Sequence, residues 1–423
     1  MNLEKYTTKE LEHLEKILEK KHKQFQESSF NLDLTRGKPS QEQLDLSDEI
    51  FNLTRNQIIS EDNSDLRNYG GIDGIKSARK LGSEILGLRE SEVISGDHSS
   101  LTLMYLYILH ALYHGVEGTG TSWINEGKIK FIAVVPGYDR HFSICEELGI
   151  ELINVEINED GPDMDKVEDL VKKDSSIKGI WCVPKYSNPT GIIYSNEVVE
   201  RIAALGKLAG PYFRVMWDNA YSVHDFSENP KKLANVMNYC KNFGTEDNLI
   251  LTASTSKITF AGGGISFLGA SKKNLDNFKK RLSIMSIGPN KLNQKKHTLF
   301  LKNLNSLKKL MQEHAKILKP KFDLVNLSLE RGLAGKGLGK WFKPEGGYFI
   351  SFDSLDGLAS KIVKLASEAG LKLTPAGSTF PYGKDPNDKN IRLAPTYPSK
   401  EELELAMQIF VNSVLLASLK KIK

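Results

Sequence analysis

The residues of this 423-residue sequence that could do chemistry follow short apolar stretches. Lys257 closes the segment Ser254-Thr255-Ser256-Lys257, Asp218 follows the apolar run 213–217, and Tyr221 lies three residues later. A lysine amine that loses its proton beside a cation or in a dry site attacks aldehydes and forms a Schiff base. A carboxylate at the end of a buried strand is unfavourable unless it is paired, for instance with a protonated ring nitrogen. We therefore predict Lys257, Asp218 and Tyr221 as catalytic residues that suit a pyridinium-phosphate cofactor.

The ring of such a cofactor needs further contacts, and the sequence offers candidates for them. Asn188 and Tyr221 could both hydrogen-bond the phenolate oxygen, and Tyr138 has a flat face that could stack on the ring. Asp218 would keep the pyridine nitrogen protonated, which makes the ring an electron sink for a carbanion. We therefore predict pyridoxal 5'-phosphate (PLP) as the cofactor, attached to Lys257.

Four serines are candidates for the phosphate of the cofactor. Ser99 and Ser100 stand at the start of a helical pattern, where hydroxyls and backbone N–H groups suit a phosphate at a helix N-terminus. Ser254 and Ser256 could add hydroxyls from the opposite side. The predicted phosphate site therefore joins the segment before the helix to the segment that carries Lys257.

Short strand-like runs alternate with helical patterns, and these elements must position the candidate residues. Strands bounded by Pro, Gly, Asn or Asp are predicted over 130–135, 151–157, 177–183, 213–217, 249–252 and 265–269. Helices are predicted over 100–114, 140–148, 164–173 and 196–209. This alternation indicates an α/β fold with a mostly parallel central sheet and helices on both faces. Because ligands of open parallel sheets lie at the carboxyl ends of the strands, the residues that follow the strands should meet there.

The pattern changes after residue 275 and indicates two domains. We predict a large PLP-binding domain over 50–310, a smaller α+β domain over 311–423, and an N-terminal segment, 1–49, that packs with the small domain. A helical stretch is predicted over 294–318, followed by helices near 357–369 and 400–419. The glycines between them fit no phosphate-loop register and are expected in a mobile surface loop: Gly332, Gly335, Gly337 and Gly339.

These segments resemble, in chain order, the signatures of class I aminotransferases of the PLP fold type I family. The resemblance spans nearly the whole chain and rests on 35–39 (TRGKP), 67–70 (RNYG), 188–191 (NPTG), 218–221 (DNAY), 254–257 (STSK), 344–349 (PEGGYF) and 390–394 (NIRLA). It implies the PLP-dependent transferase fold of type I, in which the large domain is accompanied by a smaller α+β domain.

The resemblance also implies substrate contacts and a partner. Arg392 matches the arginine that binds the substrate α-carboxylate in this family, and Gly37 lies in the glycine segment that faces this carboxylate. Asn188 is expected to contact the substrate as well as the cofactor. Tyr69 matches the tyrosine that reaches the phosphate in the partner subunit, which implies a homodimer with shared active sites.

The segment after Lys257 departs from many members of the family. They carry an arginine there that clamps the phosphate, whereas residues 258–265 contain none, so backbone N–H groups of the glycines at 262–264 are expected to balance the charge. This pattern is similar to a bacterial aspartate aminotransferase branch, resembling subgroup Ic. In that branch an arginine of the Pro-Gly-Tyr-Asp-Arg-His-Phe segment faces the substrate side chain, which gives Arg140 this role. Two arginines imply a dicarboxylic substrate, because each fork suits one carboxylate.

The expected reaction is therefore transfer of the amino group of L-aspartate to 2-oxoglutarate through a Lys257 aldimine, giving oxaloacetate and L-glutamate. Other PLP chemistry stays open: an aminotransferase for aromatic amino acids, kynurenine or aminoadipate, or a PLP lyase. An alternative of another class is a non-catalytic PLP-binding regulator. Only about 30 residues precede Asn31, which is too few for a winged helix-turn-helix domain.

Two other motifs predict different chemistry. The segment 254–257 also fits the S-x-x-K pattern of serine acylases, but the S-D-N and K-T-G companions are missing. His110 and His114 have the i, i+4 spacing of zinc ligands without the glutamate of H-E-x-x-H. We therefore expect packed histidines there, and no metal site.

The composition is that of a soluble globular protein, with 57 basic and 53 acidic residues and a net charge of +4. Neither a basic, aromatic-interleaved stripe for nucleic acid nor a transmembrane run of about 18 apolar residues is recognised. The first 25 residues lack the apolar core of a signal peptide. Three sparse cysteines, Cys145, Cys182 and Cys240, suggest a reducing compartment. We therefore expect a cytoplasmic protein whose partners are small-molecule substrates and a second subunit, with no nucleic acid and no membrane.

Overall fold

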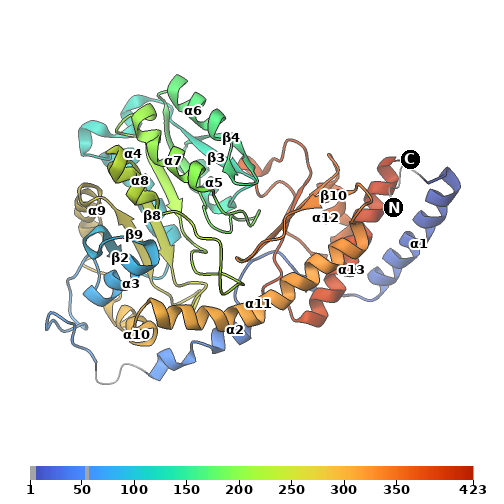
Figure 1. Cartoon of the computed structure of the whole chain (residues 1–423), viewed down its shortest axis with the longest axis horizontal. Helices are drawn as coiled ribbons and strands as arrows, with labels where there is room; N and C mark the ends of the chain where they lie inside the picture. Colours follow the sequence, from blue (N-terminus) through green and yellow to red (C-terminus); the bar gives the residue numbers. More distant parts are fainter. Residues whose placement is uncertain (1–5, 53–56, 423) are drawn as a thin grey trace.

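The computed structural model describes residues 6–52 and 57–422. The centre of its larger unit, on the left of Figure 1, is an eight-stranded mixed sheet. In spatial order its strands are β2 (Val93–Ser95), β9 (Ser266–Ala270), β8 (Leu249–Ser254), β7 (Arg214–Asp218), β6 (Ile177–Cys182), β3 (Lys130–Val135), β4 (Glu151–Asn158) and β5 (Gly161–Pro162). The five strands from β8 to β4 run parallel, and the pairs β2–β9, β8–β9 and β4–β5 are antiparallel.

Helices cover both faces of this sheet because its strands present apolar side chains on both sides. Along β3, Ile132 and Val134 pack on one face, whereas Phe131, Ala133 and Val135 pack on the other. The first face is covered by α3 (Lys76–Leu86), α6 (Met164–Lys173), α7 (Asn196–Ala209) and α8 (Val236–Phe243), and the second by α4 (Ser100–His114), α5 (Asp139–Glu147) and α9 (Lys272–Met285). The predicted α/β architecture is confirmed.

The structure corrects the sequence prediction in two places. The helical stretch predicted over 294–318 is two helices, α10 (Lys291–Leu301) and α11 (Leu304–Leu333), because the chain turns at Lys302 with a φ of 44°. The predicted glycine-rich loop is shorter than expected, since Gly332 still belongs to α11 and Gly339 begins a strand. Strands β2 and β5 fall outside the prediction because two or three residues carry no alternating signal.

The smaller unit, on the right of Figure 1, has a core of its own. Its strands are β10 (Gly339–Trp341), β11 (Ile350–Ser354) and β13 (Asn390–Leu393) in one antiparallel sheet, and β1 (Leu32–Asp33) and β12 (Leu371–Lys372) in a parallel pair. Its helices are α1 (Thr8–Glu27), α12 (Ala359–Glu368) and α13 (Lys400–Ile422), and the short helix α2 (Gln41–Asp45) lies against α11. Helix α1 packs on α13, and β1 pairs with β12, so the described part of the N-terminal segment joins the C-terminal unit. Residues 1–5 lie outside the described residues.

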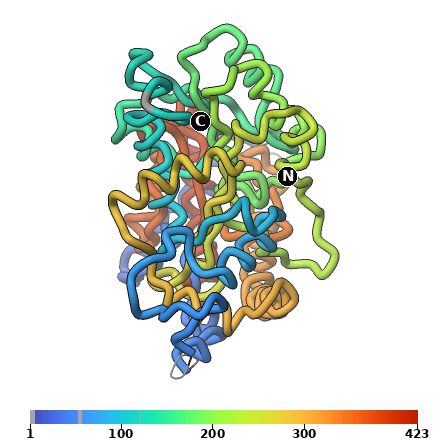
Figure 2. Tube along the Cα trace, turned by 90° about the vertical axis from the view of Figure 1, so that its left-hand side faces the viewer, coloured from blue at the N-terminus to red at the C-terminus, as the bar shows by residue number. Residues whose placement is uncertain are grey.

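The long helix α11 connects the two units. It is horizontal in Figure 1 and is seen end-on in Figure 2. Leu307 and Met311 in its first turns belong to the core of the large unit, whereas Phe322, Val325 and Leu329 belong to the core of the small one. The domain boundary drawn at residues 310 and 311 therefore falls inside a continuous helix.

Helix α13 is the most apolar helix of the small unit. By length and composition alone it could also cross a membrane, although the sequence predicts no transmembrane helix. Most of its residues are buried, because α1, α11 and α12 pack around it. Its apolar character therefore fits the central helix of a core.

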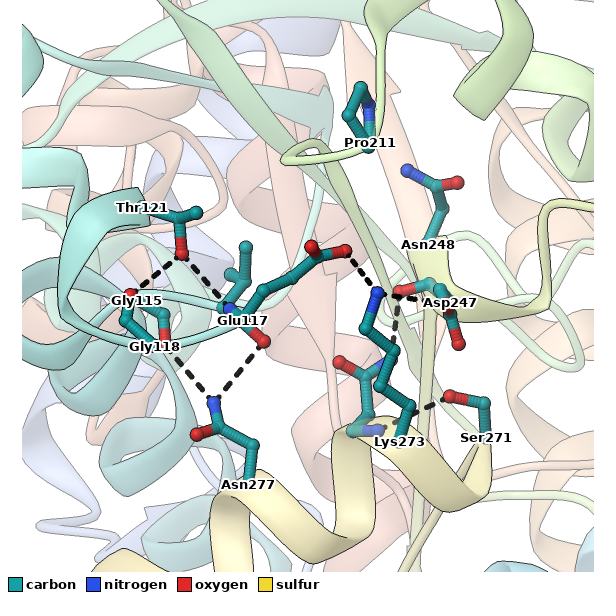
Figure 3. Close-up of polar contacts among 12 residues, drawn as sticks. Gly115, Glu117, Gly118, Thr121, Pro211, Asp247, Asn248, Ser271, Lys273 and Asn277 are labelled. Atoms are coloured by element: carbon teal, nitrogen blue, oxygen red, sulfur yellow. Dashed lines mark hydrogen bonds and ion pairs between the residues drawn. The ribbon is translucent and has the colours of Figure 1, made fainter.

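Polar contacts hold the loops at the amino ends of the parallel strands. Figure 3 shows Lys273 between Glu117 and Asp247, with Nζ 2.7 Å from Glu117 Oε1 and 3.7 Å from Asp247 Oδ2. Asn277 donates to the carbonyl oxygen of Gly115. The fully buried Arg214 donates to the backbone oxygens of two neighbours and to the hydroxyl of Tyr107. These contacts are local and structural, and the predicted site lies at the other end of the strands.

Candidate active site

The loops that follow four parallel strands bring the predicted residues together. Tyr138 comes after β3, Asn188 after β6, Asp218 ends β7, and Lys257 comes after β8. Lys257 Nζ lies 5.1 Å from the ring centroid of Tyr221 and 5.8 Å from that of Tyr348. Because parallel strands end at one edge of the sheet, residues up to 119 positions apart in sequence share one site.

Lys257 stands in a setting that favours its neutral form. Burial lowers the pKa of its amine; the negative charge of Asp218 opposes this shift, and the positive charge of Arg392 adds to it. A lowered pKa raises the fraction of free amine, which is the form that acts as a nucleophile or base. The direction of this pKa shift is the one that a nucleophilic or basic lysine would need.

Asp218 is held by two side chains that the prediction did not include. Its Oδ2 lies 3.1 Å from Nε2 of His141, and Thr252 Oγ1 donates to its Oδ1 over 3.4 Å. Both Asp218 and His141 are buried, so the carboxylate has a fixed direction. The sequence signal for His141 is its position three residues after Tyr138, one helical turn along α5. Thr252 carries no such signal, because only the strand pairing places it opposite Asp218.

The aromatic residues of the site form a stack. The ring of His141 lies flat on Trp181, with centroids 4.3 Å apart and an angle of 9°, and Tyr138 meets His141 edge-on at 4.9 Å. Burial raises the pKa of Tyr138 to about 12, with Asp218 and Asp139 adding to the shift. Burial also raises the pKa of Tyr221 well above its usual value. Both phenols therefore keep their protons at neutral pH and can donate hydrogen bonds.

Arg392 reaches this edge from the small unit. It lies in β13, and its Nη1 donates to Asp139 Oδ1 over 3.2 Å and to Asn188 Oδ1 over 3.3 Å. Its guanidinium carbon lies 4.9 Å from the ring centroid of Phe349. Gly37 lies against the same ring, since a Cβ atom there would come within 2.5 Å of it. Arg392, predicted to bind the substrate α-carboxylate, and Gly37, from the predicted glycine segment, therefore both lie against the ring of Phe349.

The serines predicted for the phosphate lie together on another side. Ser99 is the N-cap of α4, which begins at Ser100. Ser254 and Ser256 share a hydrogen bond, and Ser256 Oγ donates to the carbonyl oxygen of His98 over 3.1 Å. The segments before α4 and before Lys257 therefore meet, as the sequence predicts.

A cavity of about 690 Å³ opens beside Ser99. It is also lined by Gly262, Gly263, Asn293 and Lys296. Lys296 is the one lysine or arginine among the described residues that line it. Asn293 donates from Nδ2 to the carbonyl oxygens of Gly263 and of the glycine after it. Helix α10 therefore fixes the glycine run and carries a cation beside the serines.

Two predicted site residues have exposed side chains. Tyr69 is 83% exposed and lines a surface hollow with Ile287. Arg140 is exposed at the start of α5, although its charge reaches the hydroxyl of Tyr138 and lowers the pKa of that group against the larger effect of burial. The structure of this single chain thus leaves both side chains open to the surroundings.

A buried network behind Lys257 joins four parts of the chain and was missed in the sequence. Gln43 donates from Nε2 to Tyr348 over 3.0 Å and contacts Nδ1 of His314 at 2.9 Å. His224 Nε2 lies 3.2 Å from the backbone oxygen of Lys257. These residues come from the N-terminal segment, the small unit, α11 and the large unit, so no local pattern could group them.

Comparisons with known proteins identify the family. The family model for aspartate amino-transferase matches residues 6–423. An aspartate aminotransferase of Corynebacterium glutamicum is 43% identical over 402 residues, which cover 95% of this chain and 93% of that protein. The crystal structure of an aspartate transaminase from Corynebacterium glutamicum has a TM-score of 0.96 at 41% identity and covers 100% of both chains.

A more distant structure shows the breadth of the fold. An alpha-aminoadipate aminotransferase from Thermus thermophilus, complexed with N-(5'-phosphopyridoxyl)-L-leucine, has a TM-score of 0.73 at 19% identity, over 93% of this chain and 94% of that one. That likeness shows the fold alone, and it agrees with the fold type I architecture predicted from the sequence. Because the family model spans nearly the whole chain and a full-length relative exceeds 40% identity, the chain belongs to the aspartate aminotransferase family.

Proposed function

We propose that this protein is a PLP-dependent aminotransferase that moves the amino group of L-aspartate to 2-oxoglutarate. The observation that carries the proposal is the meeting of Lys257, Asp218 and Arg392 at one edge of the sheet, in a chain of this family. The charges of Asp218 and Arg392 both act on the amine of Lys257, so the three groups lie close enough to serve one small substrate.

The residues present fit the cofactor. Asp218 is a buried carboxylate whose Oδ1 has only the long contact from Thr252 among the described hydrogen bonds, so a protonated ring nitrogen would complete its partners. Tyr138 offers a ring face, and Tyr221 keeps a proton to donate. Ser99 at the start of α4 offers a hydroxyl and a helix N-terminus to the phosphate.

The chemistry divides between cofactor and protein. PLP, when bound, supplies an electron-withdrawing ring that stabilises the negative charge left at a substrate carbon. Lys257 Nζ, with its lowered pKa, accepts the α-proton of the amino acid and later returns it as a general acid. Asp218 would hold a proton on the ring nitrogen of the bound cofactor, and His141 keeps the carboxylate of Asp218 in place. Closure of the small unit on the large one would exclude water.

The substrate class follows from two arginines. Arg392 would bind the α-carboxylate, supported by Asn188 and by Phe349 below its guanidinium. Arg140, in the first turn of α5, would bind the distal carboxylate of the substrate. The Arg140 side chain is exposed and is therefore free to turn toward that carboxylate. A planar guanidinium binds a carboxylate through two parallel hydrogen bonds, so this pair suits aspartate and 2-oxoglutarate.

Lys296 is our candidate for the missing positive charge at the phosphate. It lines the same cavity as Ser99, Gly262 and Gly263. No arginine follows Lys257 before this glycine run, and a lysine at the cavity wall could balance the phosphate from α10. The glycine N–H groups remain a second source of donors, as the sequence suggests.

We further propose that two copies of the chain form a dimer through the face that carries Tyr69. Large apolar side chains are exposed near this face: Tyr69, Ile284, Met285 and Ile287. Such a patch on a monomer usually marks an interaction site. The occupant we propose is a second copy, because the hollow beside Tyr69 is continuous with α10 and the cavity at Ser99. Tyr69 would then reach the phosphate of the partner's site.

The thiol chemistry of the chain agrees with a reducing compartment. Cys145, Cys182 and Cys240 all lie within the described residues and are free and buried. We propose the cytoplasm as the location, where free thiols are maintained.

Absorbance of the purified protein tests the proposal. Bound PLP should give a near-visible band, and L-aspartate added without an oxo acid should bleach it as the amino group is transferred. Addition of 2-oxoglutarate should restore the band. A Lys257→Ala variant should lose at least 100-fold in turnover, in keeping with about 10²–10⁴ for a positioned general base. A band that aspartate leaves unchanged would overturn the substrate, and a protein that takes up no PLP would overturn the cofactor.

Substitution of Arg140 tests the choice of substrate. Arg140→Met should lower kcat/KM for aspartate far more than for alanine, since alanine has no distal carboxylate. The ratio of the two kcat/KM values is the measurement. An equal loss for both amino acids would show that Arg140 does not read the side chain.

A further inference from the structure

Arg392 already has an anionic partner in this structure. Its Nη1 contacts Asp139 Oδ1 at 3.2 Å, and the arginine side chain is only 7% exposed. Asp139 is the first residue of α5 and lies between Tyr138 and Arg140, the residues proposed for the ring and for the distal carboxylate. The carboxylate of Asp139 thus occupies part of the guanidinium that should bind the substrate.

The other contacts of the Arg392 guanidinium leave one of its N–H donors without an acceptor. Asn188 accepts from the same Nη1, and Phe349 covers one face. Nε of Arg392 is buried and has no hydrogen-bond partner among the described residues. A buried N–H donor without a partner is unfavourable. A ligand that offers an acceptor to Nε of Arg392 would therefore be favoured at this position. A substrate carboxylate bound through two parallel hydrogen bonds would do so.

We propose that Asp139 is a resident counter-ion of Arg392, which the α-carboxylate of the incoming substrate displaces. This inference rests on the proposed role of Arg392 in substrate binding. Before substrate binds, Asp139 neutralises a buried cation that would otherwise be unpaired. When substrate binds, its carboxylate and that of Asp139 lie on the same guanidinium and repel each other, and this repulsion favours release of Asp139.

The exchange makes Asp139 a positioning residue that governs selectivity. A ligand without a carboxylate, such as a simple amine, cannot replace Asp139 and leaves the ion pair closed. Every amino acid and oxo acid substrate must break the same ion pair, so Asp139 should weaken binding of both by the same factor. Asp139 is one-third exposed and can turn into solvent once it is released.

A purely structural role predicts something different. An acidic residue in the first turn of a helix stabilises that helix through its dipole. Glu197 holds the same kind of position in α7, which covers the opposite face of the sheet from α5. Glu197→Gln therefore serves as the matched control for loss of a helix-start charge.

Calorimetric titration with maleate, a dicarboxylate that cannot donate an amino group, tests the proposal on the PLP-loaded protein. Asp139→Asn should bind maleate about fivefold more tightly than the parent, the upper range for a partly exposed ion pair. KM for aspartate and for 2-oxoglutarate should fall by the same factor, while kcat changes little. Glu197→Gln should match the parent in both respects. Asp139→Ser, which also suits a helix start, should repeat the effect if the asparagine variant folds poorly.

The outcomes separate this inference from the proposed function. Equal or weaker maleate binding by both Asp139 variants, with normal binding by the parent, would overturn the counter-ion role and leave the function standing. A parent protein that binds no maleate would overturn the role of Arg392 and with it both proposals. A fall in KM for only one of the two substrates would also contradict the proposal, because the α-carboxylate of each substrate should displace Asp139 from Arg392.

Discussion

At the scale of single residues, burial influences which groups of the candidate site carry charge. Lys257 has a lowered pKa because protein atoms replace water around its amine. Tyr138 and Tyr221 stay protonated for the same reason, since burial disfavours their anionic forms. Burial therefore favours both the neutral amine of Lys257 and the protonated phenols of Tyr138 and Tyr221.

His141 should matter for turnover although it touches no predicted substrate atom. His141→Phe keeps a flat ring on Trp181 but removes the contact with Asp218. A hydrogen bond to a charged group is worth about 1.5–3 kcal/mol, so kcat should fall by about 10- to 100-fold. KM for aspartate should change little. Steady-state kinetics of His141→Phe and of His141→Gln, which restores a donor, provide the measurement, and equal activity in all three proteins would exclude this role.

Lys296 should control the affinity for the cofactor. Lys296→Met removes the cation from the cavity beside Ser99, and the dissociation constant of PLP should rise by about tenfold, or about 1.4 kcal/mol. The neighbouring Lys295 pairs with Glu61 instead, so Lys295→Met is the control. Titration of the cofactor-free proteins with PLP measures the constants. Identical affinities for the two variants would remove Lys296 from the phosphate site.

At the scale of elements, strand ends and loops decide which residues meet. Four of the five parallel strands each deliver a chemical group to the same edge, whereas contacts such as that of Lys273 with Glu117 lie at the opposite edge. The loop after β6 must also fit against the small unit. Gly191 in this loop has a φ of 76°, and an added Cβ would lie 2.5 Å from Cβ of Pro344.

Gly191→Ala should therefore destabilise the protein and disturb the site. The positive φ and the close contact together should lower the free energy of unfolding by about 2–3 kcal/mol. Gly210→Ala is the control, since its φ is 87° but no described atom lies within 4 Å of the added Cβ. Urea unfolding measures both. Equal losses in the two variants would show that the contact with Pro344 contributes nothing.

At the scale of the whole molecule, two cores are joined by a helix and by a buried polar network. Gln43, Tyr348, His224 and His314 link the N-terminal segment, both units and the backbone of Lys257. Burial lowers the pKa of His314 to about 4 and that of His224 to about 3. The contact of Gln43 with Nδ1 of His314 requires a neutral ring nitrogen as acceptor.

Stability should consequently fall in acid. Above the ordinary histidine pKa of about 6.5 the ring of His314 is neutral in both states, so it contributes no pH dependence. Between pH 6.5 and 4 the unfolded chain binds the proton and the folded chain does not, so stability falls as pH falls, by up to about 2 kcal/mol at pH 5. Urea unfolding at pH 7 and pH 5 should show a smaller loss for His314→Gln than for the parent. The control His13→Gln, at an exposed position, should behave as the parent does.

The proposed dimer can be tested through its apolar face. Ile284 is 78% exposed, and Ile284→Asp should dissociate the dimer because a carboxylate would lose its water at the interface. Ile17, half exposed on α1 of the small unit, provides the control Ile17→Asp, which should stay dimeric. Analytical ultracentrifugation measures both masses. A parent chain that sediments as a monomer would contradict the proposal directly.

Local sequence signals were enough to predict the alternating architecture and to name the candidate chemical groups. Apolar runs such as 130–135 and helical periods such as 100–114 are local signals, and both reappear as β3 and α4 with the same bounds. Lys257, Asp218, Asn188 and Arg392 could be named because each stands in a short motif, and strand order alone predicts that groups at the carboxyl ends meet.

The pairing of these groups, in contrast, becomes visible only in the folded chain. His141 and Asp218 are 77 positions apart, Asp139 and Arg392 are 253 apart, and Gln43 and Tyr348 are 305 apart. No periodicity links residues at such separations, because the contact depends on how one unit is seated on the other. The chain therefore encodes the chemistry locally, whereas the charge balance around Arg392 and Lys257 arises from packing between distant segments.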